Sequence, residues 1–147
     1  MIQVLCVLFT LFSAPAAMAE DTSAMAAKLG AIPAEGAELS QFLWKNRPVI
    51  VFADSENDPR FVEQMRLLAA DPAGLLARDV VVVIDTTPSN RSPLRQALRP
   101  RGFSLVIIGK DGASKIRKPL PWSVREIGRA IDKMPIRLQE IREGSGG

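Results

Sequence analysis

Three runs of apolar residues divide the chain into predicted strands. They cover Val49 to Ala53, Val80 to Ile84 and Phe103 to Ile108. None of the runs alternates regularly with polar residues, which is typical of strands that are covered on both faces. β-Branched side chains favour a strand over a buried helix in the first two runs. The pattern therefore predicts a sheet that is packed between layers of helices.

Capping signals predict where the helices between and after these strands begin. A short polar side chain followed by proline, or by glutamate three residues later, satisfies the free N–H groups of a first helical turn. Pro135 is expected to kink or break the last helix, and a further short helix is predicted over Leu39–Asn46. The capping signals occur at Asp58–Pro59, Ser92–Pro93 and Ser123–Glu126.

A tight hairpin is predicted after the third strand. Gly109 to Gly112 contains Asp-Gly, which readily takes positive φ. The returning strand carries Lys115, Arg117 and Lys118. Charged side chains of this kind protect an edge strand against further pairing, and this interpretation is favoured over contact with an anionic lipid or a polyanion.

The order of elements predicts a thioredoxin-like α/β domain. Two parallel strands are followed by an antiparallel hairpin and a closing helix, so we expect a mixed central sheet of about four strands with helices on both faces. A flavodoxin-like or Rossmann-like sheet is the alternative. That alternative does not account for the hairpin, and no G-x-G-x-x-G follows any strand.

The beginning of the chain predicts export. The apolar run Ile2–Phe12 precedes Ala17-Met18-Ala19, which has the small residues of a cleavage site. We therefore expect residues 1–19 to be a signal peptide, although no Lys or Arg precedes the run, and a retained hydrophobic anchor is the alternative. Residues 20–38 are expected to be a flexible leader, 39–143 the folded domain and 144–147 a disordered tail. The expected location is the periplasm in a Gram-negative source and otherwise the medium, with no transmembrane segment after cleavage.

The composition removes most familiar catalytic chemistry. The chain of 147 residues has no His and no Tyr, and its one cysteine is Cys6, inside the predicted signal peptide. The mature chain thus lacks the thiolate nucleophile, the usual general base and the commonest metal ligand. The net charge of +3 is modest, and no stacking aromatic residues accompany the basic ones, so nucleic-acid binding is not indicated. No cofactor is expected.

A polar loop follows the first strand and leads into a helix N-terminus, where many α/β proteins keep their chemistry. Its acids resemble part of a calcium loop, but the glycine and the distal glutamate of such a loop are missing, so no metal site is predicted. Capping of the helix and pairing with Arg60 or Arg101 is the favoured interpretation. Nothing here would activate Ser55 as a nucleophile. The loop consists of Asp54, Ser55, Glu56, Asn57 and Asp58.

Several arginines cluster near one turn of the chain. They are candidates for an anion or carboxylate site beside the polar loop, because guanidinium groups bind such ligands in a bidentate manner. Scattered surface charge is the favoured alternative. The residues are Arg91, Arg95, Arg99 and Arg101, with Arg60 expected opposite them.

The chain also resembles a known family. The resemblance is carried by three segments, FLWKNRPVIVFADSENDPR, VVVVIDTTPSNRSPLRQALRPRGFSLVIIGKDG and IRKPLPWSVREIGRAIDKMPIRLQEIRE, and covers about Leu39 to Glu143. These segments are similar to bacterial members of a domain-of-unknown-function family (4174). That family is thioredoxin- and peroxiredoxin-like, and it is also found in secreted sushi-repeat and coiled-coil-domain-containing proteins.

The resemblance implies a thioredoxin-like fold and no established activity. It places the thioredoxin catalytic pair in residues 54–58, where this chain has no cysteine. The proline that thioredoxins keep before the strand starting at Phe103 is replaced by Gly102, with Pro100 two residues earlier. Both departures argue against thiol–disulfide oxidoreductase or Cys-peroxidase activity.

The expected function is that of an exported binding or structural module, whose partner is a protein or another component of the cell envelope. The alternative is a non-thiol enzyme, or a metal- or anion-binding protein, that uses the loop 54–58 and the nearby arginines.

Overall fold

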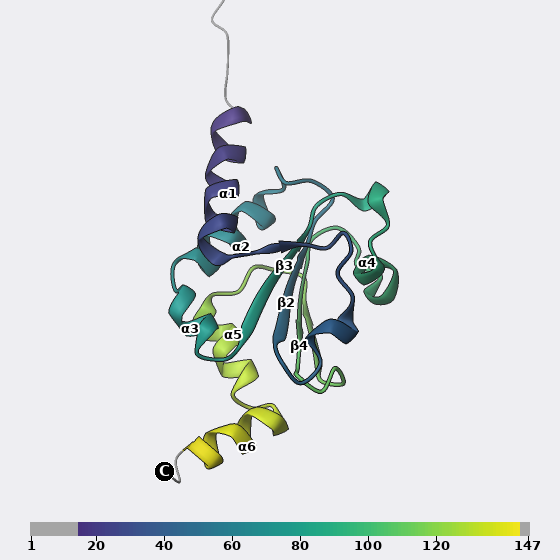
Figure 1. The fold of residues 1–147 in the computed structure, drawn as a ribbon. Coiled ribbons are helices and arrows are strands. Elements are labelled where there is room, and N and C mark those ends of the chain that lie inside the picture. Colours follow the sequence, from purple (N-terminus) through teal and green to yellow (C-terminus); the bar gives the residue numbers. More distant parts are fainter. Residues whose placement is uncertain (1–14, 145–147) are drawn as a thin grey trace, which may run out of the picture.

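The computed structural model describes residues 15–144. Five strands form one sheet in the order β1-β3-β2-β4-β5 (Figure 1). The elements in chain order are α1 (Pro15–Leu29), β1 (Ile32–Pro33), η1 (Leu39–Phe42), β2 (Arg47–Phe52), α2 (Pro59–Ala69), α3 (Pro72–Leu76), β3 (Val80–Asp85), η2 (Pro88–Asn90), α4 (Pro93–Leu98), β4 (Ser104–Ile108), β5 (Lys115–Lys118), α5 (Val124–Ile131) and α6 (Pro135–Gly144).

The sheet is mixed, as predicted. β3 pairs in parallel with both β1 and β2, whereas β4 pairs antiparallel with β2 and with β5. In the centre, Ile50 of β2 lies opposite Val83 of β3 on one side and Val106 of β4 on the other. Every residue of β2 is buried, so this strand forms the middle of the molecule.

Helices cover both faces of the sheet, which confirms the thioredoxin-like arrangement. Val49, Val51 and Leu105 point to the face that α2 and α5 cover. Ile50 and Phe52 point to the opposite face, where α4 and η1 pack. Figure 1 shows α1, α2, α3 and α5 on one side of the sheet and α4 on the other. No helix among residues 15–144 is long and apolar enough to cross a membrane.

Residues 20–38, which the sequence predicts to be a flexible leader, contain the end of α1 and the strand β1. α1 extends to Leu29, where Met25 and Leu29 pack against the core, and β1 adds a fifth strand beside β3. Gly30, with φ 59°, ends the helix, because its N–H and that of the next residue donate to the carbonyls of Ala27 and Ala26. The glycine therefore marks the end of a helix within the segment that the sequence predicts to be a leader.

The predicted signal peptide lies mostly outside the described residues. α1 begins at Pro15 and runs across the predicted cleavage site before Glu20, while residues 1–14 are not described. Cleavage therefore stays a prediction. The predicted tail falls almost wholly on residues 145–147, which also lie outside the described part.

The local start signals are confirmed. Asp58 caps α2, Ser92 caps α4, and Ser123 with Glu126 forms a capping box at α5. Pro135 starts the separate helix α6. One local prediction differs, since the predicted Leu39–Asn46 helix is only the short 3₁₀ turn η1. The short helix α3 lies between α2 and β3.

Candidate functional site

The loop 54–58 connects β2 to α2, as the thioredoxin-like arrangement requires. Its polar groups mostly hold the loop itself. The Ser55 hydroxyl accepts from the backbone N–H of Asn57 at 3.1 Å, and Asp58 Oδ1 accepts from the N–H of Arg60 at 2.9 Å. Asp58 also pairs with the Arg60 guanidinium at 3.3 Å. Burial raises the pKa of Asp58, but the hydrogen bonds from Arg60 outweigh this and keep it below its ordinary 3.8.

The three acids of the loop point to different surroundings. Asp58 is engaged with Arg60, whereas Glu56 lines a hollow beside Thr22 and Phe61. Asp54 lies on the side of Gly102, where an added Cβ would be 4.0 Å from its Oδ2. Among residues 15–144, no group of three His, Cys, Asp or Glu side chains is placed to hold a metal ion.

Gly102 is the residue that the resemblance places where thioredoxins keep a proline. Its φ of 58° lies in the left-handed region that favours glycine, and an added Cβ would also stand 4.0 Å from Arg60 Nη2. The Arg60 guanidinium lies over the Phe103 ring, 5.7 Å from its centroid. The loop after β2 and the segment before β4 therefore lie next to each other.

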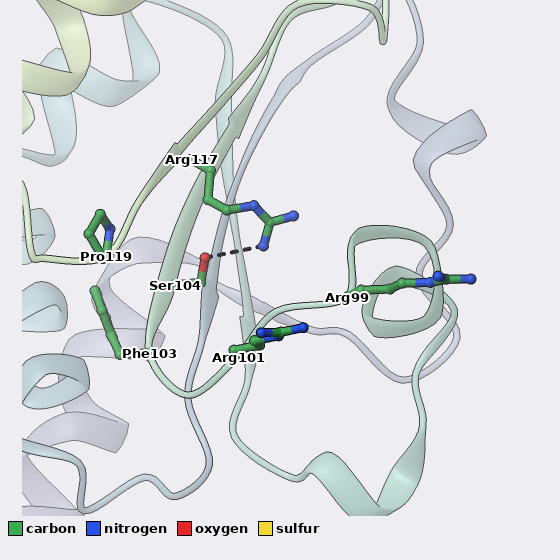
Figure 2. A pocket seen from close by; sticks show the side chains of 6 residues that line it. All are labelled: Arg99, Arg101, Phe103, Ser104, Arg117 and Pro119. Carbon is green, nitrogen blue, oxygen red and sulfur yellow. Dashed lines mark hydrogen bonds between the residues drawn. The ribbon is translucent and has the colours of Figure 1, made fainter.

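Beside this junction lies a pocket of about 400 Å³, which we call the arginine pocket. Figure 2 shows its side chains coming from the end of α4, from the segment before β4 and from β5. Its lining combines a buried aromatic ring and an exposed proline with three arginines. In Figure 2 the guanidinium groups of Arg101 and Arg117 lie beside Ser104, whereas that of Arg99 is directed away from them. The lining residues are Arg99, Arg101, Phe103, Ser104, Arg117 and Pro119.

The three arginines of the pocket are held in different ways. Arg117 is anchored to protein oxygens, since it donates to the Leu98 carbonyl and, at 3.4 Å, to the Ser104 hydroxyl. The exposed side chains of Arg99 and Arg101 have no hydrogen-bond or ion-pair partner among residues 15–144. Arg99 also takes a left-handed conformation, φ 48°, at the end of α4. Three cations thus share one pocket, and no carboxylate of the described chain is paired with any of them.

Only part of the predicted arginine cluster forms this pocket. Arg91 is exposed and does not line it, and Arg60 lies on the neighbouring side of Phe103. Arg95 turns inward instead: its Nη2 lies 2.8 Å from Oδ1 of the buried Asp85, whose Oδ2 accepts from the Ser92 hydroxyl at 2.5 Å. Arg95 is therefore a structural residue that ties α4 to the end of β3.

Arg117 is the pocket residue that sequence reasoning missed. The sequence shows only its charge and its strand, and these favour edge protection. Its place in the pocket depends on the pairing of β5 with β4, in which Arg117 lies opposite Val106. The alternation of the predicted strand is the available signal, since it separates Arg117 from its neighbour Lys118.

A second charged region, which we call the C-terminal network, was also missed. Arg47, fully buried at the start of β2, donates to the Arg78 carbonyl at 2.9 Å, and its Nη2 lies 3.1 Å from Glu140 Oε2. That last contact is not aligned as a hydrogen bond, and Arg47 Nε has no hydrogen-bond partner in the described chain. Lys110 bridges Glu140 and Asp79, at 2.8 Å to each.

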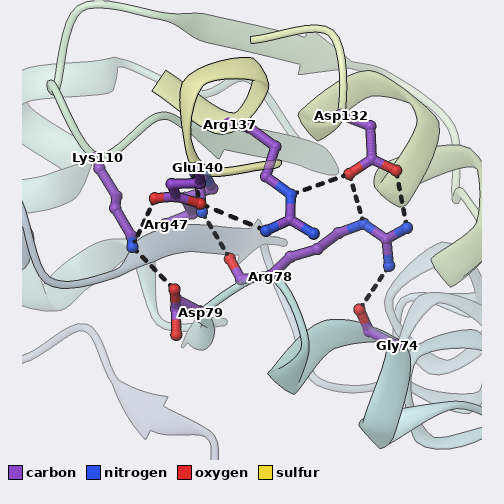
Figure 3. A network of polar contacts seen from close by, with 8 residues as sticks. All are labelled: Arg47, Gly74, Arg78, Asp79, Lys110, Asp132, Arg137 and Glu140. Carbon is purple, nitrogen blue, oxygen red and sulfur yellow. Dashed lines mark hydrogen bonds and ion pairs between the residues drawn. The ribbon is translucent and has the colours of Figure 1, made fainter. Parts of the chain in front are cut away.

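The rest of the network joins α6 to α3 and α5 (Figure 3). Arg78 pairs with Asp132 at 2.8 Å, Asp132 pairs with Arg137 at 3.2 Å, and Arg137 reaches Glu140 at 3.4 Å. The hydrogen bond from Arg78 is the main cause that lowers the pKa of Asp132. Every cation in this network has a carboxylate partner, which indicates a structural role for the region.

Comparison with known proteins agrees with the fold. The structure is similar to a solved chloroplastic thioredoxin z, with a TM-score of 0.55 at 20% sequence identity, covering 70% of this chain and 92% of that one. At this identity the likeness shows a thioredoxin-like fold and nothing further. For thioredoxin z itself, that crystal structure defines a novel type-specific target recognition.

Residues 38–140 match the family described as Domain of unknown function (DUF4174), and the chain belongs to that family. It is also 26% identical, over 133 residues, to coiled-coil domain-containing protein 80 of Danio rerio. That match covers 70% of this chain but only 15% of the relative's length. The family resemblance seen in the sequence is thereby confirmed, whereas the link to sushi-repeat proteins and a bacterial origin stay predictions.

Proposed function

We propose that this domain is an exported, non-redox binding module that holds an anionic group of a partner in the arginine pocket. The observation that carries the proposal is the pocket itself, in which Arg99 and Arg101 have no partner among the described residues and Arg117 is bound only to neutral oxygens. Cations gathered without a counter-charge repel one another, and a bound carboxylate or phosphate relieves that repulsion.

The lining favours a ligand that joins an anionic group to an apolar body. The exposed Pro119 supplies apolar surface beside the arginines, and the buried Phe103 forms the base of the lining. Arginine provides a planar fork that matches a carboxylate, so the pocket selects orientation as well as charge. An acidic side chain of a protein partner has both features. Because the site is open and small, the affinity for an isolated anion is expected to be weak and sensitive to salt.

Two features of the sequence support the rest of the proposal. The loop 54–58, at the position of the thioredoxin catalytic pair, has no cysteine, and the apolar start with Ala17-Met18-Ala19 favours export. An export role in the cell envelope predicts a mature chain that begins at Glu20. N-terminal sequencing of the protein recovered from the exported fraction of its native cell tests this point. A retained first segment would contradict it.

The binding proposal is tested by citrate and inorganic phosphate in thermal unfolding and titration calorimetry. At ten times its Kd, a ligand of the native state should raise the Tm by about 3–6 °C. Arg101→Ala should abolish the shift. Arg91→Ala is the matched control, because Arg91 is an exposed arginine outside the pocket. A shift that survives Arg101→Ala, or no shift at all, would overturn the proposed site.

The non-redox part of the proposal has its own test. The purified protein should not reduce insulin disulfides or consume peroxide above a protein-free blank. Turnover in either assay would contradict a pure binding role.

A further inference from the structure

The strand β5 forms the long free edge of the sheet. It is last in the strand order, and only β4 pairs with it. The opposite edge, β1, has just two residues, one of which is Pro33 and lacks an N–H. β5 has four residues and no proline, so it is the edge that can accept a further strand.

The pairing with β4 fixes which backbone groups of β5 face outward. Gly109 donates to the Ser114 carbonyl at 2.8 Å, and in an antiparallel ladder every second residue pair is hydrogen-bonded. Ile116, opposite Ile107, therefore points its backbone groups inward, whereas Lys115 and Arg117 direct their N–H and C=O groups to the free edge. Pro119, two residues after Arg117, would be the next residue to face outward, but proline has no backbone N–H to donate.

The two faces of β5 each border a cationic hollow. The Arg117 side chain belongs to the arginine pocket, while Ile116 packs against the core on the other face. An open hollow of about 460 Å³ borders that second face and reaches Lys115 at the start of β5, and we call it the lysine hollow. Its lining includes Lys115, Lys118, Trp122, Lys133 and Met134.

The charges of the lysine hollow are also unpaired. The Lys118 ammonium lies 4.6 Å from the centroid of the Trp122 ring, and none of the three lysines has a carboxylate partner among residues 15–144. A segment lying along β5 would send alternate side chains to opposite faces, into the arginine pocket and the lysine hollow in turn. Both places favour acidic side chains with an apolar stem.

We infer that an extended acidic segment of a partner protein adds to β5 as a sixth strand, with acidic side chains alternating between the arginine pocket and the lysine hollow. The inference rests on the proposed function, since it names the ligand of the arginine pocket. Backbone hydrogen bonds from Lys115 and Arg117 hold the segment, and the two cationic hollows select its sequence.

The charges on β5 also explain why the edge does not pair with itself. Two β5 strands side by side would bring Lys115, Arg117 and Lys118 near their copies, and like charges on neighbouring strands are destabilising. The same side chains attract an acidic strand. Edge protection and selective strand addition are therefore two results of one charge pattern.

The test uses the full exported protein and an acetylated hexapeptide of the order Glu-Val-Glu-Glu-Val-Glu, which gives each face both glutamate and valine. Two further versions carry N-methyl groups, one on the odd positions only and the other on every position. In a strand, one set of N–H groups faces the neighbouring strand and the other faces solvent. The version methylated on odd positions keeps one complete edge of N–H groups and should bind like the parent peptide, whereas the fully methylated version should bind about tenfold or more weakly. Equal binding of both versions would overturn strand addition.

Variants of the protein test the same contacts from the other side. Lys115→Pro removes an outward N–H at the first residue of an edge strand, where proline is tolerated. Lys115→Ala is its matched control, since it removes the same charge and keeps the N–H. The proline variant should bind the parent peptide about tenfold more weakly than the alanine variant. Equal affinities would contradict the inferred hydrogen bonds, and the peptide experiment stands even if the proline variant does not fold.

The outcomes separate this inference from the proposed function. A citrate shift that depends on Arg101, together with equal binding of both methylated peptides, would overturn strand addition and leave the binding pocket standing. Peptide binding that is selective for one methylated version but unchanged by Arg101→Ala would overturn the pocket as the acidic side-chain site. Binding to phosphatidylglycerol vesicles without binding to any peptide would overturn the protein segment as the ligand.

Discussion

The C-terminal network and the arginine pocket differ in whether carboxylates of the same chain balance the charge of their arginines. In the C-terminal network, Arg47, Arg78 and Arg137 each pair with a carboxylate of the same chain. In the arginine pocket, Arg99 and Arg101 have no such partner in the described residues. Arginine therefore stabilises the fold in the C-terminal network, whereas in the arginine pocket it is available to bind a ligand. The distinction leads to separate predictions for stability and for binding.

The largest effect is expected at the centre of the C-terminal network. Arg47→Ala removes a fully buried side chain that reaches both Arg78 and Glu140, and leaves a cavity at the start of β2. We expect a loss of about 3 kcal/mol in the free energy of unfolding, measured by urea denaturation. Arg101→Ala is the matched control and should change stability by about 0.5 kcal/mol at most. Similar losses in the two variants would erase the distinction between the regions.

The next effect tests whether Arg95 belongs with the structural arginines. Asp85→Asn keeps the size of the buried side chain but removes the charge that faces Arg95 at 2.8 Å. We expect a loss of about 2 kcal/mol in urea denaturation, because a partly buried guanidinium loses its counter-charge. Citrate binding should be unaffected. If Asp85→Asn left the stability unchanged but altered citrate binding, Arg95 would belong to the arginine pocket and would not be a structural residue.

The network should contribute to the pH dependence of stability. Asp132 has a pKa lowered chiefly by the hydrogen bond from Arg78, and burial raises that of Glu140 less than Lys110 and Arg47 lower it. A carboxyl whose pKa is lower in the folded state contributes stability above its ordinary pKa, and this contribution is lost as pH falls through the folded value. Stability should therefore decline as pH drops below the ordinary values of 4.5 for Glu and 3.8 for Asp.

Asp132→Asn isolates one group in that decline. The variant should be less stable at neutral pH and should lose less stability on acidification, as followed by urea denaturation at several pH values. The difference should be smaller than that of Arg47→Ala, because Asp132 is about one third exposed and solvent screens its pairs. If the variant and the original protein lost the same free energy of unfolding on acidification, Asp132 would not contribute to that loss.

Local structure could be predicted from the sequence, whereas the C-terminal network could not. Strands and helix starts follow from signals a few residues apart, such as Asp58 before Pro59 and Ser123 with Glu126. The C-terminal network depends on partners far apart in the chain: Arg47 meets Glu140 only after β2 is inserted in the sheet and α6 packs across its end. Its residues look like ordinary surface charges in the sequence, so neither burial nor pairing could be predicted.

The candidate site was visible in part. Arg99 and Arg101 could be predicted because they are neighbours in sequence and follow a predicted helix. Arg95 was grouped with them because a spacing of four residues places Arg95 and Arg99 on one face of a helix, but α4 ends at Leu98 and Arg99 takes a left-handed conformation, so of the two only Arg95 faces Asp85. Arg117 joins the pocket through the β4–β5 register, which the sequence did not determine.

The smallest effect expected on stability has the opposite sign. Arg99 ends α4 in the left-handed region, with φ 48°, where glycine is the residue that has no steric cost. Arg99→Gly should therefore raise the free energy of unfolding by about 0.5–1 kcal/mol while weakening the citrate-induced rise in Tm. Arg91→Gly is the matched control, because Arg91 has φ 44° and lies outside the pocket. It should gain similar stability and keep full citrate binding. If both variants lost binding equally, general positive charge and not the arginine pocket would attract the anion.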